Sequence, residues 1–195
     1  MTNESPEQPA EHGADPEPDN PAAFQVRRIV TGHNQEGQGV IVSDEVMDAH
    51  SRGDGEGING CDIWSTESMP IDNSTPFDAT QRAGYVKHYN YVGSGQGTVV
   101  RIVEWSPGHA YFPHRTLTLD YSILLSGEID VLLDSNQVVH MKAGDVIVMR
   151  GVTHTWINRS ERPAVTAFVL LDAQPIKTNG QTTLEPLYPA HLAIN

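Results

Sequence analysis

The feature that most constrains the fold is a series of short strand-like segments that begins at Tyr85. The segments read VKHYNYV, TVVRIVEW, HRTLTLDYSILL, EIDVLL, QVVHM, DVIVM, HTWIN and AVTAFVLL, and turn residues such as GSGQG, SPG, DSN, KAGD and NRSERP separate most of them. Many short strands at this spacing are typical of an all-β sandwich or barrel, and no segment has a helical period. Because the sequence shows no internal duplication, we predict one barrel and not a tandem pair.

The chain divides by composition into four parts. Six acidic residues and no Lys or Arg occupy the first twenty positions, so we predict that residues 1–22 form a disordered acidic tail. Residues 23–84 are expected to supply a hairpin (FQVRRIVT and VIVS), a Gly- and Asp-rich loop at 44–60 and a short strand, all packing on the barrel. The barrel itself is expected at 85–175, and 176–195 form a C-terminal extension.

Charge and composition exclude several classes of partner. The net charge of −13 argues against nucleic acid, because phosphate binding requires clustered Lys and Arg. No apolar run approaches the ~18 residues of a membrane helix, and the N-terminus lacks the apolar stretch of a secretory signal. The single cysteine, Cys61, cannot form an internal disulfide. A cytoplasmic location is therefore the default expectation.

The segment HRTLTLDY carries the clearest chemical signal. His114, Thr116, Thr118 and Asp120 stand at every second position, so a strand would place them on one face. The opposite face is mainly apolar. A polar stripe of this kind in a barrel is expected to line a cavity.

This segment and GDVIVMRGVTHTWIN together resemble the two motifs of the cupin superfamily. In the first motif Gly108 is followed after five residues by His114, then by Thr116, Asp120 and Gly127, and the second motif contains Gly144, Gly151, His154 and Asn158. The resemblance covers about residues 98–172 and implies a single cupin barrel, which is a double-stranded β-helix or jelly roll. It is specific for the fold and weak for the reaction, because cupins catalyse many reactions.

The departures from the cupin pattern leave the cofactor open. A family-type metal site uses three His and one Glu, whereas Thr116 replaces the second His and Asp120 replaces the Glu. His114, Asp120 and His154 could hold one divalent metal ion (Fe, Zn or Mn) as a facial triad. Equally, the same three residues could form a metal-free catalytic acid–base site.

Four further residues are candidates for binding a substrate: Thr116, Thr118, Trp156 and Arg101. Trp156 shares a face with His154. Either Arg101 or Glu104 should point into the barrel, since they lie on opposite faces of one strand.

The leading hypothesis is a cupin enzyme, a lyase or isomerase that dehydrates, decarboxylates or isomerises a small organic substrate by His/Asp acid–base catalysis. The alternatives are an Fe(II)-dependent oxygenase that uses His114, Asp120 and His154, and a barrel that binds a small ligand without turnover. We also expect a homodimer, because small cupins generally pair and AVTAFVLL is apolar on both faces.

Overall fold

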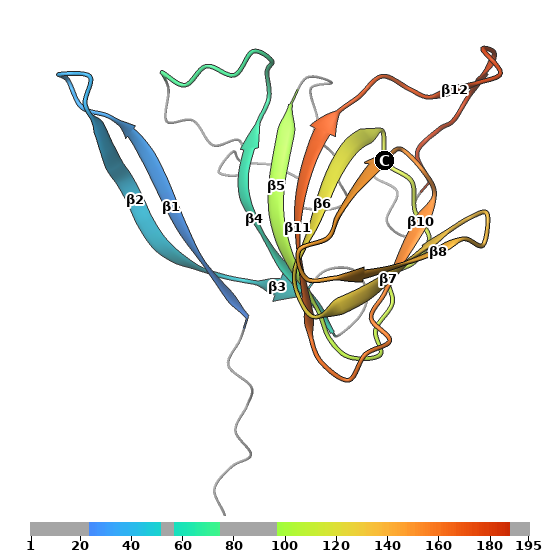
Figure 1. Ribbon diagram of the computed structural model, residues 1–195. Helices are drawn as coiled ribbons and strands as arrows, with labels where there is room; N and C mark the ends of the chain where they lie inside the picture. Colours follow the sequence, from blue (N-terminus) through green and yellow to red (C-terminus); the bar gives the residue numbers. More distant parts are fainter. Residues whose placement is uncertain (1–23, 52–56, 75–96, 188–195) are drawn as a thin grey trace, which may run out of the picture.

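The computed structural model describes residues 24–51, 57–74 and 97–187, and every regular element within these ranges is a β-strand (Figure 1). The strands are β1 (Gln25–His33), β2 (Gly39–Asp48), β3 (His50–Ser51), β4 (Ile58–Thr66), β5 (Thr98–Trp105), β6 (Thr118–Ser126), β7 (Glu128–Leu133), β8 (Val138–Lys142), β9 (Val146–Arg150), β10 (His154–Ile157), β11 (Ala164–Asp172), β12 (Lys177–Thr178) and β13 (Thr182–Thr183). The expected tail at 1–22 and the expected strand VKHYNYV lie outside the described residues. No helix in these ranges is long and apolar enough to cross a membrane.

Two facing sheets make up the body of the molecule. The larger has the order β3-β4-β5-β11-β6-β9, and the smaller has the order β10-β7-β8. All the pairings in both sheets are antiparallel. Figure 1 shows β4, β5, β11 and β6 side by side, with β7, β8 and β10 turned toward them. This is the all-β cupin architecture that the sequence predicts.

The alternation of side chains along the strands produces the core between the sheets. On β5 every second residue is buried, from Val99 to Trp105. The larger sheet also contributes Leu124, and the smaller sheet contributes Ile129, Val131, Met141 and Trp156, all at most 2% exposed. The apolar core therefore lies between β5, β6 and the smaller sheet.

The turn between β6 and β7 requires a glycine. Gly127 has a φ of +75°, which L side chains rarely adopt. A Cβ at this position would lie 2.6 Å from the carbonyl oxygen of Pro163. This close approach joins the β6–β7 turn to the start of β11 and explains the second glycine of the first motif.

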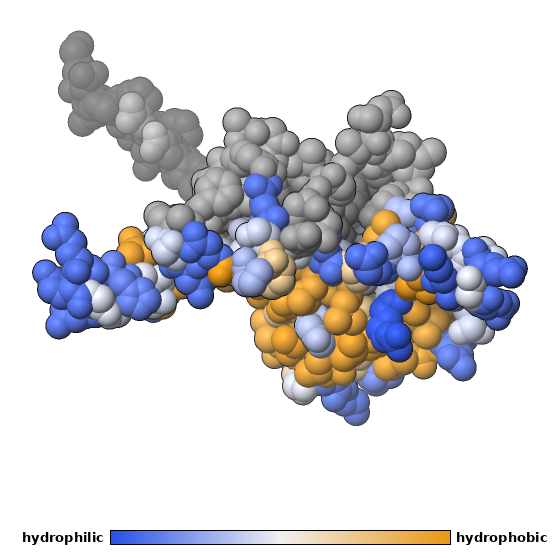
Figure 2. Space-filling view, turned by 90° about the horizontal axis from the view of Figure 1, so that it is seen from above, coloured by the Kyte–Doolittle hydropathy of each residue, from blue (hydrophilic) through white to orange (hydrophobic). Residues whose placement is uncertain are grey.

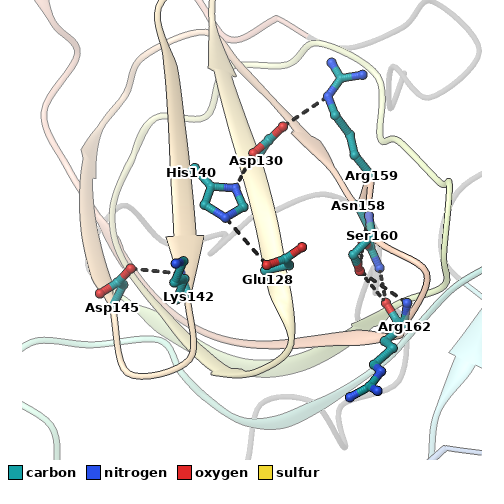
Figure 3. Close-up of polar contacts among 9 residues, drawn as sticks. All are labelled: Glu128, Asp130, His140, Lys142, Asp145, Asn158, Arg159, Ser160 and Arg162. Atoms are coloured by element: carbon teal, nitrogen blue, oxygen red, sulfur yellow. Dashed lines mark hydrogen bonds and ion pairs between the residues drawn. The ribbon is translucent and has the colours of Figure 1, made fainter.

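Asn158 closes the end of the barrel next to this turn. Its Nδ2 donates to the carbonyl oxygens of Trp105 and Arg162 at 2.9 and 2.8 Å. Its Oδ1 accepts hydrogen bonds from the backbone N–H and the hydroxyl of Ser160 (Figure 3). A fully buried amide that satisfies all these groups has a structural role.

The outer side of the β7–β8 pair carries an exposed network of charges. His140 Nδ1 lies 2.8 Å from Asp130 Oδ1, and its Nε2 lies 3.6 Å from Glu128 (Figure 3). Arg159 Nε donates to the other oxygen of Asp130 at 3.0 Å. These groups link β7, β8 and the segment after β10 on the surface, away from the core.

The hairpin of β1 and β2 diverges from the body at its tip (Figure 1). Arg28 attaches it to β4, since its Nη1 donates to the carbonyl oxygen of Ile63 at 2.9 Å and its guanidinium lies 5.9 Å from the centre of the Trp64 ring. The prediction of a hairpin here is confirmed. The loop predicted at 44–60 is wrong at both ends, because β2 continues to Asp48 and β4 begins at Ile58.

The surface of the body has a continuous apolar area (Figure 2). The exposed large apolar side chains of the body come mostly from β6, β8 and β9, where Val146 and Val148 are 58% and 52% exposed. On the outer face of the larger sheet, Val148 stands directly opposite Tyr121. The edge strand β9 thus presents apolar groups to solvent.

Candidate active site

The polar stripe predicted along HRTLTLDY faces the interior. His114, Thr116, Thr118 and Asp120 are all at most 4% exposed, while the residues between them are only half-buried. The strand itself begins later than predicted, at Thr118, because the chain bends at Leu117. The alternation therefore predicted correctly which side chains enter the barrel.

The backbone pairs His114 with His154. Each N–H donates to the other residue's carbonyl oxygen at 3.0 Å, in an isolated antiparallel bridge. The imidazole rings lie with their centres 4.3 Å apart and their planes at 55°. Two segments 40 residues apart in sequence thereby bring both predicted histidines together.

Backbone carbonyls fix the tautomer of both rings. His114 Nδ1 lies 3.1 Å from the oxygen of Phe112, and His154 Nδ1 lies 3.0 Å from the oxygen of Val152. Since a carbonyl can only accept, each Nδ1 carries the proton, and the lone pair of each neutral ring is on Nε2. Two lone-pair nitrogens are therefore offered by adjacent rings.

Burial keeps both histidines neutral. Desolvation, with smaller effects of the neighbouring His154 and the charge of Arg101, lowers the pKa of His114 to about 3, although the hydrogen bond to Phe112 acts to raise it. Desolvation also lowers the pKa of His154. At neutral pH neither ring carries a charge, so both act as hydrogen-bond or ligand acceptors through Nε2.

Asp120 is the buried carboxyl of the site. It is 3% exposed, and its Oδ1 has no hydrogen-bond partner. Desolvation raises the pKa of Asp120 to about 6, while Thr118, the charge of Arg101 and Thr116 each act to lower it. The hydroxyl of Thr118 also donates to that of Thr116 at 2.8 Å. The two threonines thus support the carboxyl and each other.

Arg101, not Glu104, points inward. Arg101 is 6% exposed, and its Nε donates to Oδ1 of the equally buried Asp62 at 2.9 Å. The two residues stand directly opposite each other on β5 and β4. Because the charge of Arg101 acts on the pKa of both His114 and Asp120, this cation belongs to the same interior.

Trp156 packs beside His154 in the aromatic part of the core. Its ring stacks on Trp105 at 5.9 Å and meets Phe168 edge-to-face at 5.2 Å. The ring of His154 lies 6.1 Å from it at a right angle. Trp156 is 2% exposed. It is therefore a core residue, and its ring also supports that of His154.

Two residues of this interior escaped the sequence analysis. Asp62 carries no chemical signal in the sequence, and its contact with Arg101 depends on strand pairing that the sequence does not display. Ser122 continues the alternation of Thr118 and Asp120 by one more step and is fully buried. The signal for Ser122 was therefore present in the pattern.

A complete family-type metal site does not fit these residues. The Nε2 atoms of His114 and His154 are suitable ligands, but among the described residues no three His, Cys, Asp or Glu side chains form a group that could hold a metal ion. At the position of the second cupin histidine, the hydroxyl of Thr116 is engaged with Thr118. The donor set here is a pair of imidazoles with a separate carboxyl.

A groove of about 610 Å³ runs along β6 and β9. Its walls are mainly apolar and include Leu119, Val148 and Ile176, but Thr116 and Thr118 of the polar stripe also line it. The groove contains none of His114, Asp120 and His154.

Comparison with known proteins agrees with this architecture. Residues 101–170 match the family model described as "Cupin domain". "Phomopsin biosynthesis cluster protein C'" of Diaporthe leptostromiformis is 33% identical over 159 residues, covering 79% of this chain and 82% of that protein. "Cupin-domain-containing oxidoreductase fogC" of Aspergillus ruber is 32% identical, covering 80% of this chain and 77% of that protein. "Oryzines biosynthesis cluster protein J" of Aspergillus oryzae is 32% identical and covers 90% and 97%. The facing antiparallel sheets, the inward stripe and these similarities together show that the chain belongs to the cupin family.

Proposed function

We propose that this cupin is an enzyme, a lyase or isomerase that moves a proton on a small organic substrate, with Asp120 as the acid–base group. The observation that carries the proposal is the state of this carboxyl: it is buried, its Oδ1 has no partner, and its pKa is raised to about 6. An acid–base group works best when its pKa lies near the working pH. Carboxyls whose pKa is shifted by burial are common where a group acts on a substrate.

In this proposal the histidine pair binds and orients the substrate. With a pKa of about 3, His114 is a weak base at neutral pH. Its Nε2 and that of His154 are better suited to accept hydrogen bonds from a substrate and to orient it. The bridge between the two backbones holds both acceptors at a fixed spacing.

One carboxylate is sufficient for the reactions considered. In an isomerisation, Asp120 takes a proton from one carbon, the electron pair of the C–H bond shifts into the substrate, and the proton returns to another carbon. In a dehydration, the electron pair forms the new C=C bond as the C–O bond breaks, and the departing hydroxyl takes the proton from Asp120 and leaves as water. Both sequences restore the carboxylate.

The test is solvent deuterium incorporation into enolisable ketones and β-hydroxy ketones, followed by NMR in D₂O after treatment with a chelator. We expect exchange by the wild-type protein and a loss of about 10²–10⁴-fold in Asp120→Asn, the usual contribution of a positioned acid or base. Asp134→Asn, at an exposed turn, is the matched control and should retain the full rate.

A second candidate, an oxidoreductase, is favoured by a separate observation. The relative fogC and the related "Cupin-domain-containing oxidoreductase virC" of Hypocrea virens, 32% identical, are both named oxidoreductases. Oxygen uptake with a candidate substrate, lost in His114→Ala and His154→Ala, would support this function in place of proton transfer. If the protein shows neither deuterium exchange nor oxygen uptake with the compounds tested, the function that remains is binding of a small ligand without turnover.

A further inference from the structure

Ser122 is a buried hydroxyl for which the fold supplies no partner. It is 0% exposed, and its Oγ makes no hydrogen bond. Buried hydroxyls are nearly always hydrogen-bonded, because leaving one unpaired costs free energy. Each exception in a structure requires an explanation.

The unpartnered oxygen of Asp120 lies on the same face of the same strand. Asp120 and Ser122 are two positions apart on β6, which places their side chains on the same face as successive inward residues. Both residues therefore offer an unsatisfied oxygen at one place in the interior. Two such atoms together are a stronger sign of a binding site than either alone.

The neighbouring strands explain why both oxygens are unpartnered. Ser122 stands in register between Phe168 on β11 and Ile147 on β9. Asp120 stands between Leu170 and Met149 on the same two strands. None of these side chains can donate or accept a conventional hydrogen bond, so neither neighbouring strand supplies a partner at these positions.

The charges around the two oxygens limit the chemistry of that partner. An anionic group would face the carboxylate of Asp120, and a cationic group would face Arg101, which lies one strand beyond Phe168 in the same row. A neutral hydroxyl avoids both repulsions. It can donate to Oδ1 of Asp120 and accept from the Oγ–H of Ser122, which satisfies both atoms at once.

We propose that Ser122 is a substrate-binding residue and that, with Asp120, it holds a hydroxyl group of a neutral substrate. The ring of Phe168 beside Ser122, itself 5.2 Å from that of Trp156, favours a ring compound as the carrier of this hydroxyl. The inference rests on the proposed function in one respect: this hydroxyl lies next to the acid–base group and is the one that a dehydration would remove.

The probes are phenol and toluene. They have nearly the same shape, but phenol carries a hydroxyl where toluene carries a methyl group. Their binding to the full chain is measured by calorimetric titration for the wild type and Ser122→Ala, with Ser126→Ala at the exposed end of β6 as the control. We expect the wild type to prefer phenol. Ser122→Ala should bind phenol about tenfold more weakly, the equivalent of one hydrogen bond, with toluene binding unchanged.

The melting temperature separates binding from a structural role. Removing a hydroxyl that has no partner in the fold should leave the melting temperature of the free protein unchanged or higher. A lower melting temperature for Ser122→Ala, or equal binding of phenol and toluene by the wild type, overturns the proposal. Deuterium exchange that depends on Asp120 while phenol binding ignores Ser122 refutes only this subsite. The reverse result refutes only the proton-transfer function.

Discussion

His114 and His154 are held opposite each other by two hydrogen bonds between their own backbones, each 3.0 Å long. Their separation therefore does not depend on a bound ion. Both Nε2 atoms are available because both Nδ1 atoms are taken by carbonyls two residues earlier in the chain. This pre-formed pair makes the next position of the stripe, Thr116, decisive for metal affinity.

Thr116→His is expected to create a metal-binding protein. Thr116 is 1% exposed and lies on the same face as His114, so the substitution adds a third imidazole beside the pair. Three imidazoles complete the protein ligands of a common zinc site. Calorimetric titration with Zn²⁺ should show at least about tenfold tighter binding than in the wild type, where the pair alone is available.

Thr116→Val is the control for that experiment, because it removes the same hydroxyl without adding a ligand. It should bind Zn²⁺ like the wild type. Unchanged Zn²⁺ binding in a folded Thr116→His protein would show that position 116 does not face the histidine pair.

Asp120→Asn should change how stability depends on pH. Because the folded state raises the pKa of Asp120 from 3.8 to about 6, folding favours the protonated carboxyl, and the wild type loses stability from this residue as the pH rises from 4 through 6. At 1.4 kcal/mol per pKa unit, the loss is roughly 3 kcal/mol. The variant lacks this loss, so its stability relative to the wild type should increase across that interval.

Urea unfolding at pH 4 to 8 measures this difference. The comparison uses the change with pH and not the absolute value, since the amide has hydrogen-bonding needs of its own. His114 acts in the opposite sense: its lowered pKa removes stability as the pH falls below 6.5. A difference between Asp120→Asn and wild type that is constant from pH 4 to 8 would contradict the assignment.

Asn158→Ala should destabilise the fold without altering the chemistry. The substitution removes the hydrogen bonds that Nδ2 donates to the carbonyl oxygens of Trp105 and Arg162, and those that Oδ1 accepts from Ser160. Because each lost hydrogen bond and each buried polar group left unsatisfied costs free energy, we expect the free energy of unfolding to fall by about 2–4 kcal/mol. Chemical denaturation measures it, and deuterium exchange below the unfolding transition should proceed at the wild-type rate.

We propose that the chain pairs with a second copy through the outer face around β9. Val148 and Tyr121 stand opposite each other on this face, and β9 is the edge strand of the larger sheet. An exposed apolar edge usually requires a cover. Val148→Lys should convert a dimer into a monomer in sedimentation velocity experiments.

The control for this prediction is Ala143→Lys, which adds the same charge at an exposed turn beside β9. It should remain dimeric. A monomeric wild type at micromolar concentration would refute the proposed pairing.

The parts of the fold that follow from local alternation could be predicted, and those that follow from strand pairing could not. The residues of β5 and β7 appear in the sequence as complete strands, and the inward stripe of His114 to Asp120 follows from a period of two. The bend at Leu117 and the contact of Asp62 with Arg101 depend on partners distant in sequence. β3 and the start of β4 resemble a loop because Gly and Asp surround them, and pairing overrides that composition.

The register of β11 has a consequence for the electrostatics of the interior. Phe168 stands between Arg101 on one side and Ser122 on the other, and Leu170 separates Val99 from Asp120. The central strand β11 therefore lies between the two charged groups. The guanidinium of Arg101 lowers the pKa of Asp120 through its charge alone, while its Nε donates directly to Asp62. In the sheet, the apolar side chains of β11 thus stand between this cation and the acid–base group.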